Sequence, residues 1–506
     1  MRAMTMIPAM AVVLAASPLH AQSTSPQSAT LDSIAPQIEA GFTTFMVENH
    51  VPGLVYGVVQ GGHLALVKGE GVQDLAARRP VTPDSLFRIA SMTKAFTALS
   101  ILSLRDKGLL ALDDPAEKYV PEMRGWTYPT SDSPKIRVRD LLQHVAGFVT
   151  DDPWGDRQQV LSQEDFTALL KTGVPFTREP QARHEYSNLG YAILGRIVAN
   201  VTHQPYRRYV EKTFLVPLGM TSSGYDTPAS PIERRAVGYR WENGVWSEEP
   251  TMKDGAFNSM GGLQVSANDY AKWIAFLLSG WPARDGPETG PVRRATIREL
   301  AQGLNFVSIA TRPGSTGATA CPLALAYGMG WRVMQDCDLG LTMSHGGGYP
   351  GYGSHVMLMP EYGTGIFVLT NRTYAGPTGP AWDAAMLMHK AGLLHRPEMP
   401  VSSDLASFYA AAQAVWQAGT VAPLNGRVAM NFPMDRTAEN WTKVLGELKA
   451  QAGTCDTAAP VTPTGRMTGT FRWTCGKGSV NGQIVLAPTR PITIQALRFT
   501  FEGAVP

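Results

Sequence analysis

The chain has 506 residues, of which 44% are hydrophobic and 17% are charged. This balance is typical of a folded, soluble protein that is long enough for more than one domain. The 44 basic and 42 acidic residues give a formal net charge of +2. They form no long basic run and no basic cluster interleaved with aromatic residues, so the composition argues against a nucleic-acid partner.

Residues 1–21 have the pattern of an export signal. Arg2 is followed by an apolar run from about Ile7 to Ala16 and by small residues leading to Ala21. The run is too short to span a membrane, and no later segment offers an uninterrupted apolar span, so we expect no stable membrane insertion. We therefore expect a periplasmic or secreted protein; the alternative is a frayed apolar N-terminus without a targeting role.

The four cysteines fall into two local pairs, Cys321 with Cys337 and Cys455 with Cys475. In an exported protein both pairs could close as disulfides; four reduced core cysteines are the alternative. No pair has C-x-x-C spacing, and the ten histidines are scattered without ligand spacing. We therefore expect no metal and no cofactor.

In chain order, the predicted elements begin with a β-hairpin over residues 51–74 that turns at Gly61-Gly62. An apolar helix starts at Ser91 and ends near Gly108. Helices dominate from there to about residue 200, and residues 326–371 predict at least three antiparallel strands. This order indicates a mixed sheet flanked by helices.

Two prolines and a polar stretch near residues 393–404 predict a domain boundary. Residues 28–395 then form a larger domain, and residues 400–506 form a small α+β domain. The small domain should contain two helices followed by three strands, at residues 405–418, 438–452, 467–474, 483–486 and 493–501. In outline this order resembles cystatin-like and nuclear-transport-factor-like modules.

Ser91 and Lys94 lie three positions apart at the start of the apolar helix, so their side chains share one face. Serine needs a base to act as a nucleophile, and Lys94 can be that base if burial favours its neutral form. The free N–H groups of the helix N-terminus favour negative charge, so the N–H of Ser91 could form half of an oxyanion hole. The alternative is a capping serine beside a solvated lysine.

Two further motifs offer polar groups that suit the same chemistry. Tyr186 and Asn188 lie in a turn before a helix; a phenol near a cationic lysine loses its proton more readily, and an amide can bind a substrate amide. His345 ends an apolar strand and is followed by three glycines, which would let backbone approach a peptide-like substrate. Taken alone, these motifs also fit a capping turn and a plain glycine-rich loop.

Three motifs in this order, Ser91-Met92-Thr93-Lys94, Tyr186-Ser187-Asn188 and His345-Gly346-Gly347, resemble those of the class C β-lactamase and penicillin-binding-protein group. The peptidase branch of this group is called the S12 serine peptidases. The similarity covers about residues 35–390 and includes the segments "LLQHVAGF" and "YGMGWRV". It implies an α/β and α+β fold, in which helices and an all-helical subdomain flank an antiparallel sheet.

The resemblance also implies roles for individual residues. Ser91 would attack a carbonyl to form an acyl-enzyme, Lys94 and Tyr186 would move the proton, and Asn188 would help to hold the acyl side chain. Gly348 would supply a second oxyanion N–H, and Gly347 would belong to the same substrate-binding strand.

His345, the fourth expected catalytic residue, stands where β-lactamases of this group usually carry a lysine that suits the carboxylate of penicillins. Histidine at this place is more typical of peptidases, amidases and esterases. We therefore predict an exported serine hydrolase that cleaves a small-molecule amide or a short peptide through an acyl-Ser91 intermediate. The alternatives are a carboxylesterase of the same family, and a weak β-lactamase or a penicillin-binding or sensory protein without efficient turnover.

Overall fold

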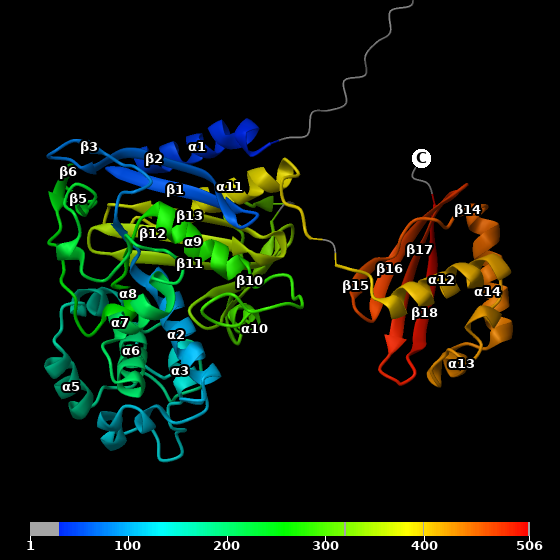
Figure 1. Ribbon diagram of the computed structural model, residues 1–506, viewed down its shortest axis with the longest axis horizontal. Coiled ribbons are helices and arrows are strands. Elements are labelled where there is room, and N and C mark those ends of the chain that lie inside the picture. Colours follow the sequence, from blue (N-terminus) through cyan, green and yellow to red (C-terminus); the bar gives the residue numbers. More distant parts are fainter. Residues whose placement is uncertain (1–29, 318–319, 398, 504–506) are drawn as a thin grey trace, which may run out of the picture. The chain divides into compact units, whose positions relative to one another are not determined.

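The computed structural model describes residues 30–317, 320–397 and 399–503, and Figure 1 shows its helices and strands. The chain divides into two compact units. One contains Pro287–His395 and the described chain up to Gly280; the other contains Trp281–Gly286 and the described chain from Arg396. The predicted export signal, residues 1–21, lies outside the described residues. Among the helices of the described ranges, none is long and apolar enough to cross a membrane.

The larger unit is built on a nine-stranded antiparallel sheet with the strand order β3-β2-β1-β13-β12-β11-β10-β9-β8. The predicted hairpin β1–β2 joins β13, with Leu54 paired to Thr370, so strands from both ends of the unit meet inside the sheet. The strands of this sheet are β1 (Gly53–Gln60), β2 (His63–Asp74), β3 (Arg79–Pro80), β8 (Asn305–Thr311), β9 (Pro322–Tyr327), β10 (Arg332–Asp336), β11 (Gly340–Tyr349), β12 (Tyr352–Met359) and β13 (Thr364–Thr370). Two short ribbons pair β4 (Phe87–Arg88) with β7 (Gln264–Val265) and β5 (Tyr239–Glu242) with β6 (Val245–Glu248).

Helices cover both faces of this sheet. Alternate residues of β1 point to opposite faces: Tyr56 stacks on Phe42 of α1 (Leu31–Glu48), which packs beside α11 (Thr378–Lys390). On the other face, Phe367 of β13 contacts Tyr270 of α9 (Ala267–Leu278). Because both faces are covered, β1 is apolar and buried over almost its whole length.

The remaining helices of the larger unit include α2, a nearly all-buried helix that carries Lys94 at its first position. They are α2 (Lys94–Asp106), α3 (Val138–Leu142), α4 (Asp152–Gly155), α5 (Gln163–Thr172), α6 (Asn188–Thr202), α7 (Tyr206–Val210), α8 (Asn258–Gly261) and α10 (Arg294–Glu299). Of these, α3, α7 and α8 pack against α6. Figure 1 labels these helices apart from α4.

The C-terminal unit is an antiparallel sheet with helices packed on it. The strand order is β14-β16-β17-β18, and β15 also pairs with β16. Its elements are α12 (Ser403–Ala418), α13 (Asn431–Asp435), α14 (Ala438–Ala452), β14 (Cys455–Asp456), β15 (Thr462–Gly465), β16 (Thr468–Cys475), β17 (Gly478–Ala487) and β18 (Thr493–Gly503). The predicted α+β class is confirmed; α13, β14 and β15 are short elements that the sequence pattern did not indicate.

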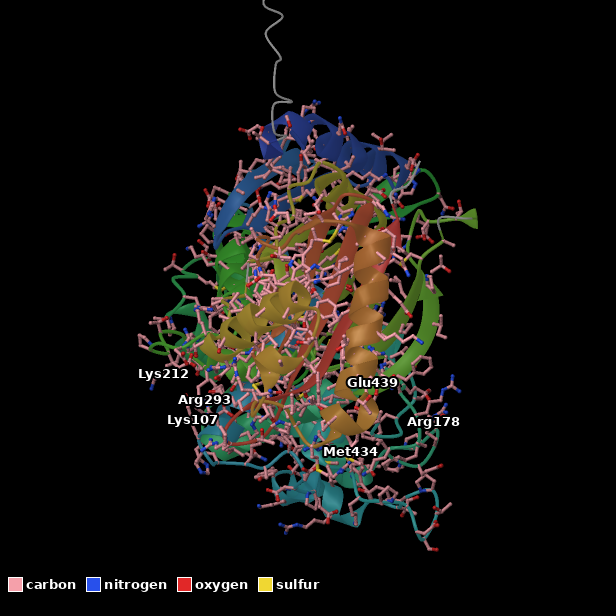
Figure 2. All side chains as sticks on the ribbon, turned by 90° about the vertical axis from the view of Figure 1, so that its right-hand side faces the viewer. Lys107, Arg178, Lys212, Arg293, Met434 and Glu439 are labelled. Atoms are coloured by element: carbon pink, nitrogen blue, oxygen red, sulfur yellow. A yellow bond between two sulfur atoms is a disulfide. The ribbon has the colours of Figure 1, made fainter. Side chains whose placement is uncertain are left out.

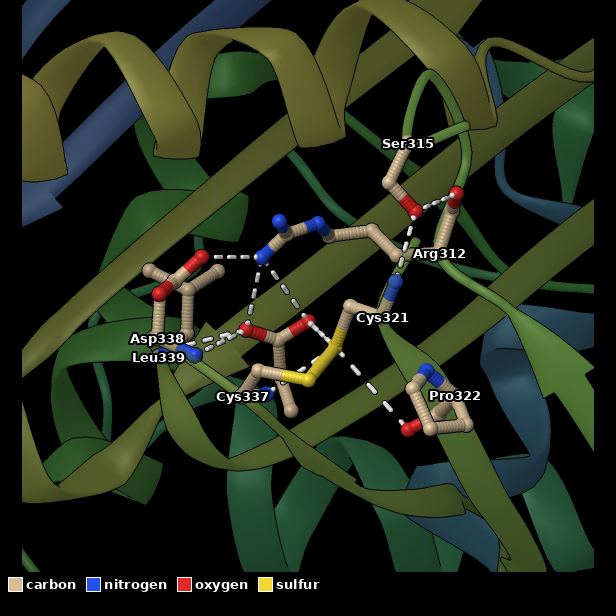
Figure 3. Close-up of a disulfide and its surroundings, with 8 residues drawn as sticks. Arg312, Ser315, Cys321, Pro322, Cys337, Asp338 and Leu339 are labelled. Atoms are coloured by element: carbon tan, nitrogen blue, oxygen red, sulfur yellow. Dashed lines mark hydrogen bonds and ion pairs between the residues drawn. A yellow bond between two sulfur atoms is a disulfide. The ribbon is translucent and has the colours of Figure 1, made fainter. Parts of the chain in front are cut away.

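Both cysteine pairs are closed as disulfides, Cys321–Cys337 and Cys455–Cys475. Figure 3 shows the first of them beside a buried ion pair, in which Arg312 Nη1 lies 3.0 Å from Asp336 Oδ1. The second joins residues that face each other across the β14–β16 ladder. Each disulfide therefore connects neighbouring segments of one unit.

Candidate active site

Ser91 lies in a 3₁₀ turn, Ala90–Thr93, that leads directly into α2. Residues three apart eclipse each other in such a turn, and Lys94 Nζ lies 3.0 Å from Ser91 Oγ. The preceding Ala90 has a φ of 47°, a left-handed conformation that is uncommon for a residue other than glycine. The helix expected from Ser91 therefore starts at Lys94, and the tighter turn before it brings the two side chains together.

The Lys94 amine is fully buried and has three polar partners. Besides Ser91 Oγ, it lies 2.6 Å from Asn188 Oδ1 and 2.8 Å from the backbone oxygen of Met260. Those two carbonyl oxygens can only accept hydrogen bonds. A neutral amine would thus give both its N–H bonds to them and keep its lone pair for the Ser91 hydroxyl.

Electrostatics make the neutral form of Lys94 accessible. Burial lowers the pKa of Lys94 to about 8, against the opposing effect of the carboxylates of Asp152, Asp156 and Asp151. Two of those carboxylates are held behind Asn188, whose Nδ2 donates to Asp152 Oδ1 at 3.1 Å and to Asp156 Oδ1 at 3.4 Å. A base with a pKa near the working pH is the kind that general base catalysis favours.

Tyr186 contacts both members of this pair. Its hydroxyl shares a hydrogen bond with Ser91, and the centre of its ring lies 4.9 Å from Lys94 Nζ. Burial raises the pKa of Tyr186 well above its ordinary value, with Tyr327 and Asp152 adding to the rise. The expectation that the neighbouring cation favours a phenolate is therefore wrong: burial outweighs the cation, and Tyr186 is a phenol that can donate a proton.

The hydrogen-bond partners of the Asn188 side-chain amide are protein side chains, although a contact with the substrate was expected. Its side chain is fully buried, its oxygen accepts from Lys94, and its two N–H bonds point to Asp152 and Asp156. It does not line the cleft over Ser91. In this structure Asn188 supports Lys94, and its contact with the acyl side chain stays a prediction.

His345 lines the cleft, but both of its ring nitrogens are engaged. Nδ1 lies 2.6 Å from the backbone oxygen of Gly346, so it carries the proton, and Nε2 then accepts from the Tyr327 hydroxyl at 3.0 Å. Burial, together with the charges of Lys94 and Arg332, holds the pKa of His345 well below its ordinary value. The imidazole is therefore neutral, and it provides no fixed cation for a substrate carboxylate.

The glycines after His345 form an open stretch of β11. Strand β10 pairs with β11 only as far as Ser344, whereas β12 pairs with it on the other side through Tyr349. A Cβ atom at Gly347 would collide with the Ile89 carbonyl, so glycine is required for the close approach of β11 to the Ser91 turn. Among the described residues, β10 makes no ladder pair with this stretch past Ser344, so the side of β11 turned away from β12 is open where the strand contacts the Ser91 turn.

These groups surround a cleft of about 480 Å³ over Ser91. All seven predicted site residues line it or touch its lining: Ser91, Tyr186, His345, Gly347 and Gly348 line it, Lys94 bonds to Ser91, and Asn188 bonds to Asp152 and Asp156. Further lining residues are Asp152, Pro153, Asp156, Arg332, Gly346, Ser354, Tyr374 and Gly376.

The sequence profile described as Beta-lactamase matches residues 38–391. The chain belongs to the β-lactamase family. Among similar curated proteins, "Protein flp" of Staphylococcus aureus (strain N315) is 28% identical over 332 residues, covering 64% of this chain and 60% of that protein. Penicillin-binding protein 4* of Bacillus subtilis (strain 168) is 25% identical over 331 residues, covering 62% and 66%. The chain thus spans about 60% of the length of the first of these relatives.

Solved structures show the same fold at low sequence identity. The octameric penicillin-binding protein homologue from Pyrococcus abyssi aligns with a TM-score of 0.60 and 21% identity, over 92% of this chain and 99% of that one. A class C β-lactamase aligns with a TM-score of 0.56 and 19% identity, over 72% of this chain and 98% of that one. The family and the fold expected from the three motifs are both confirmed.

Several residues that shape this β-lactamase-family site were not singled out in the sequence. His144 accepts the N–H of Ser187 at 3.1 Å, and Asp151 accepts the N–H groups of Asn188 and Leu189 at 2.6 and 2.9 Å, so these two hold the turn after Tyr186. Tyr327 fixes His345. His144 and Tyr327 lie in the segments "LLQHVAGF" and "YGMGWRV", whose resemblance to the family could have indicated a role in the site. The aspartates of "TDDPWGD" are typical of a polar loop, and nothing in their sequence pattern indicated a role in the site.

Proposed function

We propose that the chain is an exported serine hydrolase that cleaves a peptide or amide bond in a short peptide through an acyl-Ser91 intermediate. The observation that carries the proposal is the 3.0 Å contact between Ser91 Oγ and a buried Lys94 amine whose pKa is lowered to about 8. The N-terminal pattern and the two disulfides support export. In this proposal residues 28–395 form the hydrolase domain and residues 400–506 a separate folding domain.

Acylation would begin with transfer of the Ser91 hydroxyl proton to neutral Lys94. Ser91 Oγ then attacks the carbonyl carbon, and the N–H groups of Ser91 and Gly348 hold the negative oxygen that forms. The C–N bond breaks as the leaving nitrogen receives a proton from the Tyr186 hydroxyl, and the Lys94 ammonium, which holds the former Ser91 proton, returns a proton to Tyr186. In deacylation, water gives one proton to Lys94 and its oxygen bonds to the acyl carbon; the bond from the acyl carbon to Ser91 Oγ then breaks, and Lys94 passes the proton to Oγ, which restores the Ser91 hydroxyl.

Charges at two places along the cleft support a short peptide as the substrate. Arg332 is paired with Ser344, next to His345, and makes no ion pair in the described part of the chain. Beyond Gly348, Tyr374 donates to Asp156 at 3.1 Å. A carboxylate at the Arg332 end and an ammonium group at the Asp156 end would complement these charges.

Penicillin binding is the second candidate, because Arg332 offers the cation that a neutral His345 does not. Penicillin-binding protein 4* is among the similar proteins. In this case a β-lactam carboxylate would lie at Arg332, and the acyl-enzyme would be long-lived.

Active-site labelling followed by mass spectrometry tests the nucleophile. A fluorophosphonate and a β-lactam should each add once to the full chain, and Ser91→Ala should abolish both adducts. An adduct that persists unchanged in Ser91→Ala would refute the assignment. Turnover of unblocked dipeptides and tripeptides, compared with nitrophenyl esters and a β-lactam, then separates the peptidase from the esterase and from the penicillin-binding protein.

A further inference from the structure

A groove of about 470 Å³ lies along strand β18 of the C-terminal unit. We call it the β18 groove, and all of its lining residues belong to this unit. They are Phe432, Asp435, Arg436 and Trp441, from α13, α14 and their connection, and the six consecutive residues Gln495–Thr500 of β18. Figure 2 labels Met434 and Glu439, which lie on α13 and α14 beside it.

Strand β18 is the edge of its sheet, and most of its outer side is open. It pairs with β17 on the inner side. On the outer side, Val428 bridges to Ile494, and Asn431 Nδ2 donates to the backbone oxygen of Gln495 at 3.0 Å. Beyond Gln495 the outer edge has no backbone hydrogen-bond partner in the described ranges. Such an edge can accept an extended chain as a further strand.

The groove is apolar on the side that faces the helices. Phe499 of β18 is 9% exposed, and it lies with Phe432 and Trp441 in the core cluster of the unit. The rings of Phe432 and Trp441 are stacked, with centroids 5.5 Å apart. Trp441 is 4% exposed, and its indole N–H is buried without an acceptor among the described residues. A buried donor without a partner marks a place where packing is incomplete.

The polar side of the groove is positively charged. Arg436 lies 4.6 Å from the centre of the Trp441 ring, and Arg498 is an exposed residue of β18. Neither arginine makes an ion pair with a described residue, whereas the groove's carboxylate, Asp435, accepts from Asn431 at 2.7 Å. By contrast, Arg472 of β16 is paired with Glu502 at 2.6 Å.

These charges select among the possible occupants. An antiparallel strand from a second copy of the chain, centred on the groove, would set the two Arg498 side chains opposite each other, and like charges in opposing positions are destabilising. An acidic strand would instead place opposite charge beside Arg498, with Arg436 adding positive charge from its position against Trp441. Alternation along an added strand would place apolar side chains toward Phe432, Trp441 and Phe499 and acidic ones toward Arg498.

We propose that the β18 groove binds an extended acidic segment of a partner protein, which adds to the sheet as a strand beside β18. The proposal is independent of the chemistry at Ser91, because every contact that it uses lies in the C-terminal unit.

The test uses the full chain and a fluorescein-labelled peptide, Ser-Glu-Leu-Glu-Phe-Glu-Thr-Ser, with blocked ends. Fluorescence anisotropy should show saturable binding that weakens as salt is raised. The double charge reversal Arg436→Glu with Arg498→Glu should weaken binding at least tenfold. Lys443→Glu, on the same helix as Trp441 but outside the groove lining, should bind as the unmodified chain does.

Two further measurements separate strand addition from loose electrostatic attraction. A peptide with lysine at each glutamate position should bind poorly to the unmodified chain and better to the double variant. N-methylation of one alternating set of peptide amides should abolish binding, and backbone amides between Ala496 and Thr500 should become protected from hydrogen exchange when the unmethylated peptide is bound.

The proposal is overturned if the glutamate peptide fails to bind at millimolar concentration, if the double variant binds it unchanged, or if the lysine peptide binds the unmodified chain equally well. A concentration-dependent dimer of the unmodified chain that the double variant abolishes would assign the groove to a second copy and would also overturn it. Unchanged thermal unfolding of the double variant confirms that any loss of binding is local.

Discussion

Lys94 and Arg312 are two of the buried cationic residues of the larger unit, and their surroundings differ in one respect that decides their chemistry. Lys94 contacts a hydroxyl and two carbonyl oxygens, with the nearest carboxylates held behind Asn188. Arg312 contacts carboxylates directly, at 3.0 Å to Asp336 and 2.7 Å to Asp338 (Figure 3). A directly paired guanidinium remains charged and immobile, whereas an amine among neutral acceptors can release its proton.

The comparison shows how one unit can contain both a fixed, charged ion pair and a base that titrates. Arg312 and Asp336 join the segment just after β8 to the end of β10, next to the Cys321–Cys337 disulfide. Lys94 joins α2 to α6 and α8 through acceptors that bring no charge of their own. The following predictions test this contrast, from the largest expected effect to the smallest.

Removing the base should abolish turnover. We expect Lys94→Ala to lower kcat/KM by about 10⁴-fold, the upper range for general acid–base catalysis. The measurement is steady-state hydrolysis of whichever unblocked peptide or ester the chain turns over. Lys272→Ala, at an exposed lysine paired with Asp269, is the control and should keep full activity. Near-normal activity of Lys94→Ala would show that another group takes the Ser91 proton.

Breaking the ion pair between Arg312 and Asp336 should lower the free energy of unfolding and leave catalysis unchanged. Arg312→Met leaves the fully buried Asp336 carboxylate without its guanidinium, which typically costs about 3–5 kcal/mol. Urea unfolding of the larger unit measures the loss, and kcat/KM of the folded fraction should be unchanged. Arg208→Met, which removes an exposed pair with Glu211, should change the free energy of unfolding by less than about 1 kcal/mol.

Removing the Cys321–Cys337 disulfide should lower the free energy of unfolding slightly less than Arg312→Met does. Cys321 and Cys337 are separated by 16 residues, and closing a loop of that size stabilises a fold by about 3 kcal/mol in the chain-entropy model. The double variant Cys321→Ser with Cys337→Ser should therefore unfold at lower urea concentration while its kcat/KM is retained. A large loss of activity at full folding would contradict a purely structural role.

Placing a carboxylate in contact with the Lys94 amine should raise the pKa of Lys94. Lys94 acts when it is unprotonated, so kcat/KM should rise with pH through the lysine pKa of about 8. Asn188→Asp replaces the oxygen 2.6 Å from Nζ by a carboxylate oxygen, which favours the charged amine and should move the rising limb to higher pH by about 1 unit or more.

Asp156→Asn is the matched opposite change. The Asp156 carboxylate raises the pKa of Lys94, so its removal should move the rising limb to lower pH, by less than the Asn188→Asp shift because Asp156 does not contact the amine. Full pH–rate profiles of both variants provide the measurement. Shifts in the same direction would refute the view that Lys94 titrates in this limb.

The sequence-based predictions are confirmed for features that depend only on residues close together in the chain. Ser91 and Lys94 share a face because three residues separate them in one turn, and the hairpin over β1 and β2 follows from alternating residues around Gly61-Gly62. The order of the three motifs was sufficient to predict the family, the fold and part of the cleft lining. The helix and strand order of the C-terminal unit could be predicted for the same reason, since hydrophobic periodicity is a local property.

Other features depend on contacts between distant parts of the chain. Burial raises the pKa of Tyr186, which reverses the direction expected from Lys94 alone, and burial becomes known only once the surrounding residues are in place. Tyr327 fixes His345, and the aspartates of the segment around α4 occupy the amide of Asn188. By itself, the sequence determined which groups could react. The tertiary structure decided which of them are neutral, engaged or free, because desolvation and hydrogen bonding depend on neighbours that the chain brings together only on folding.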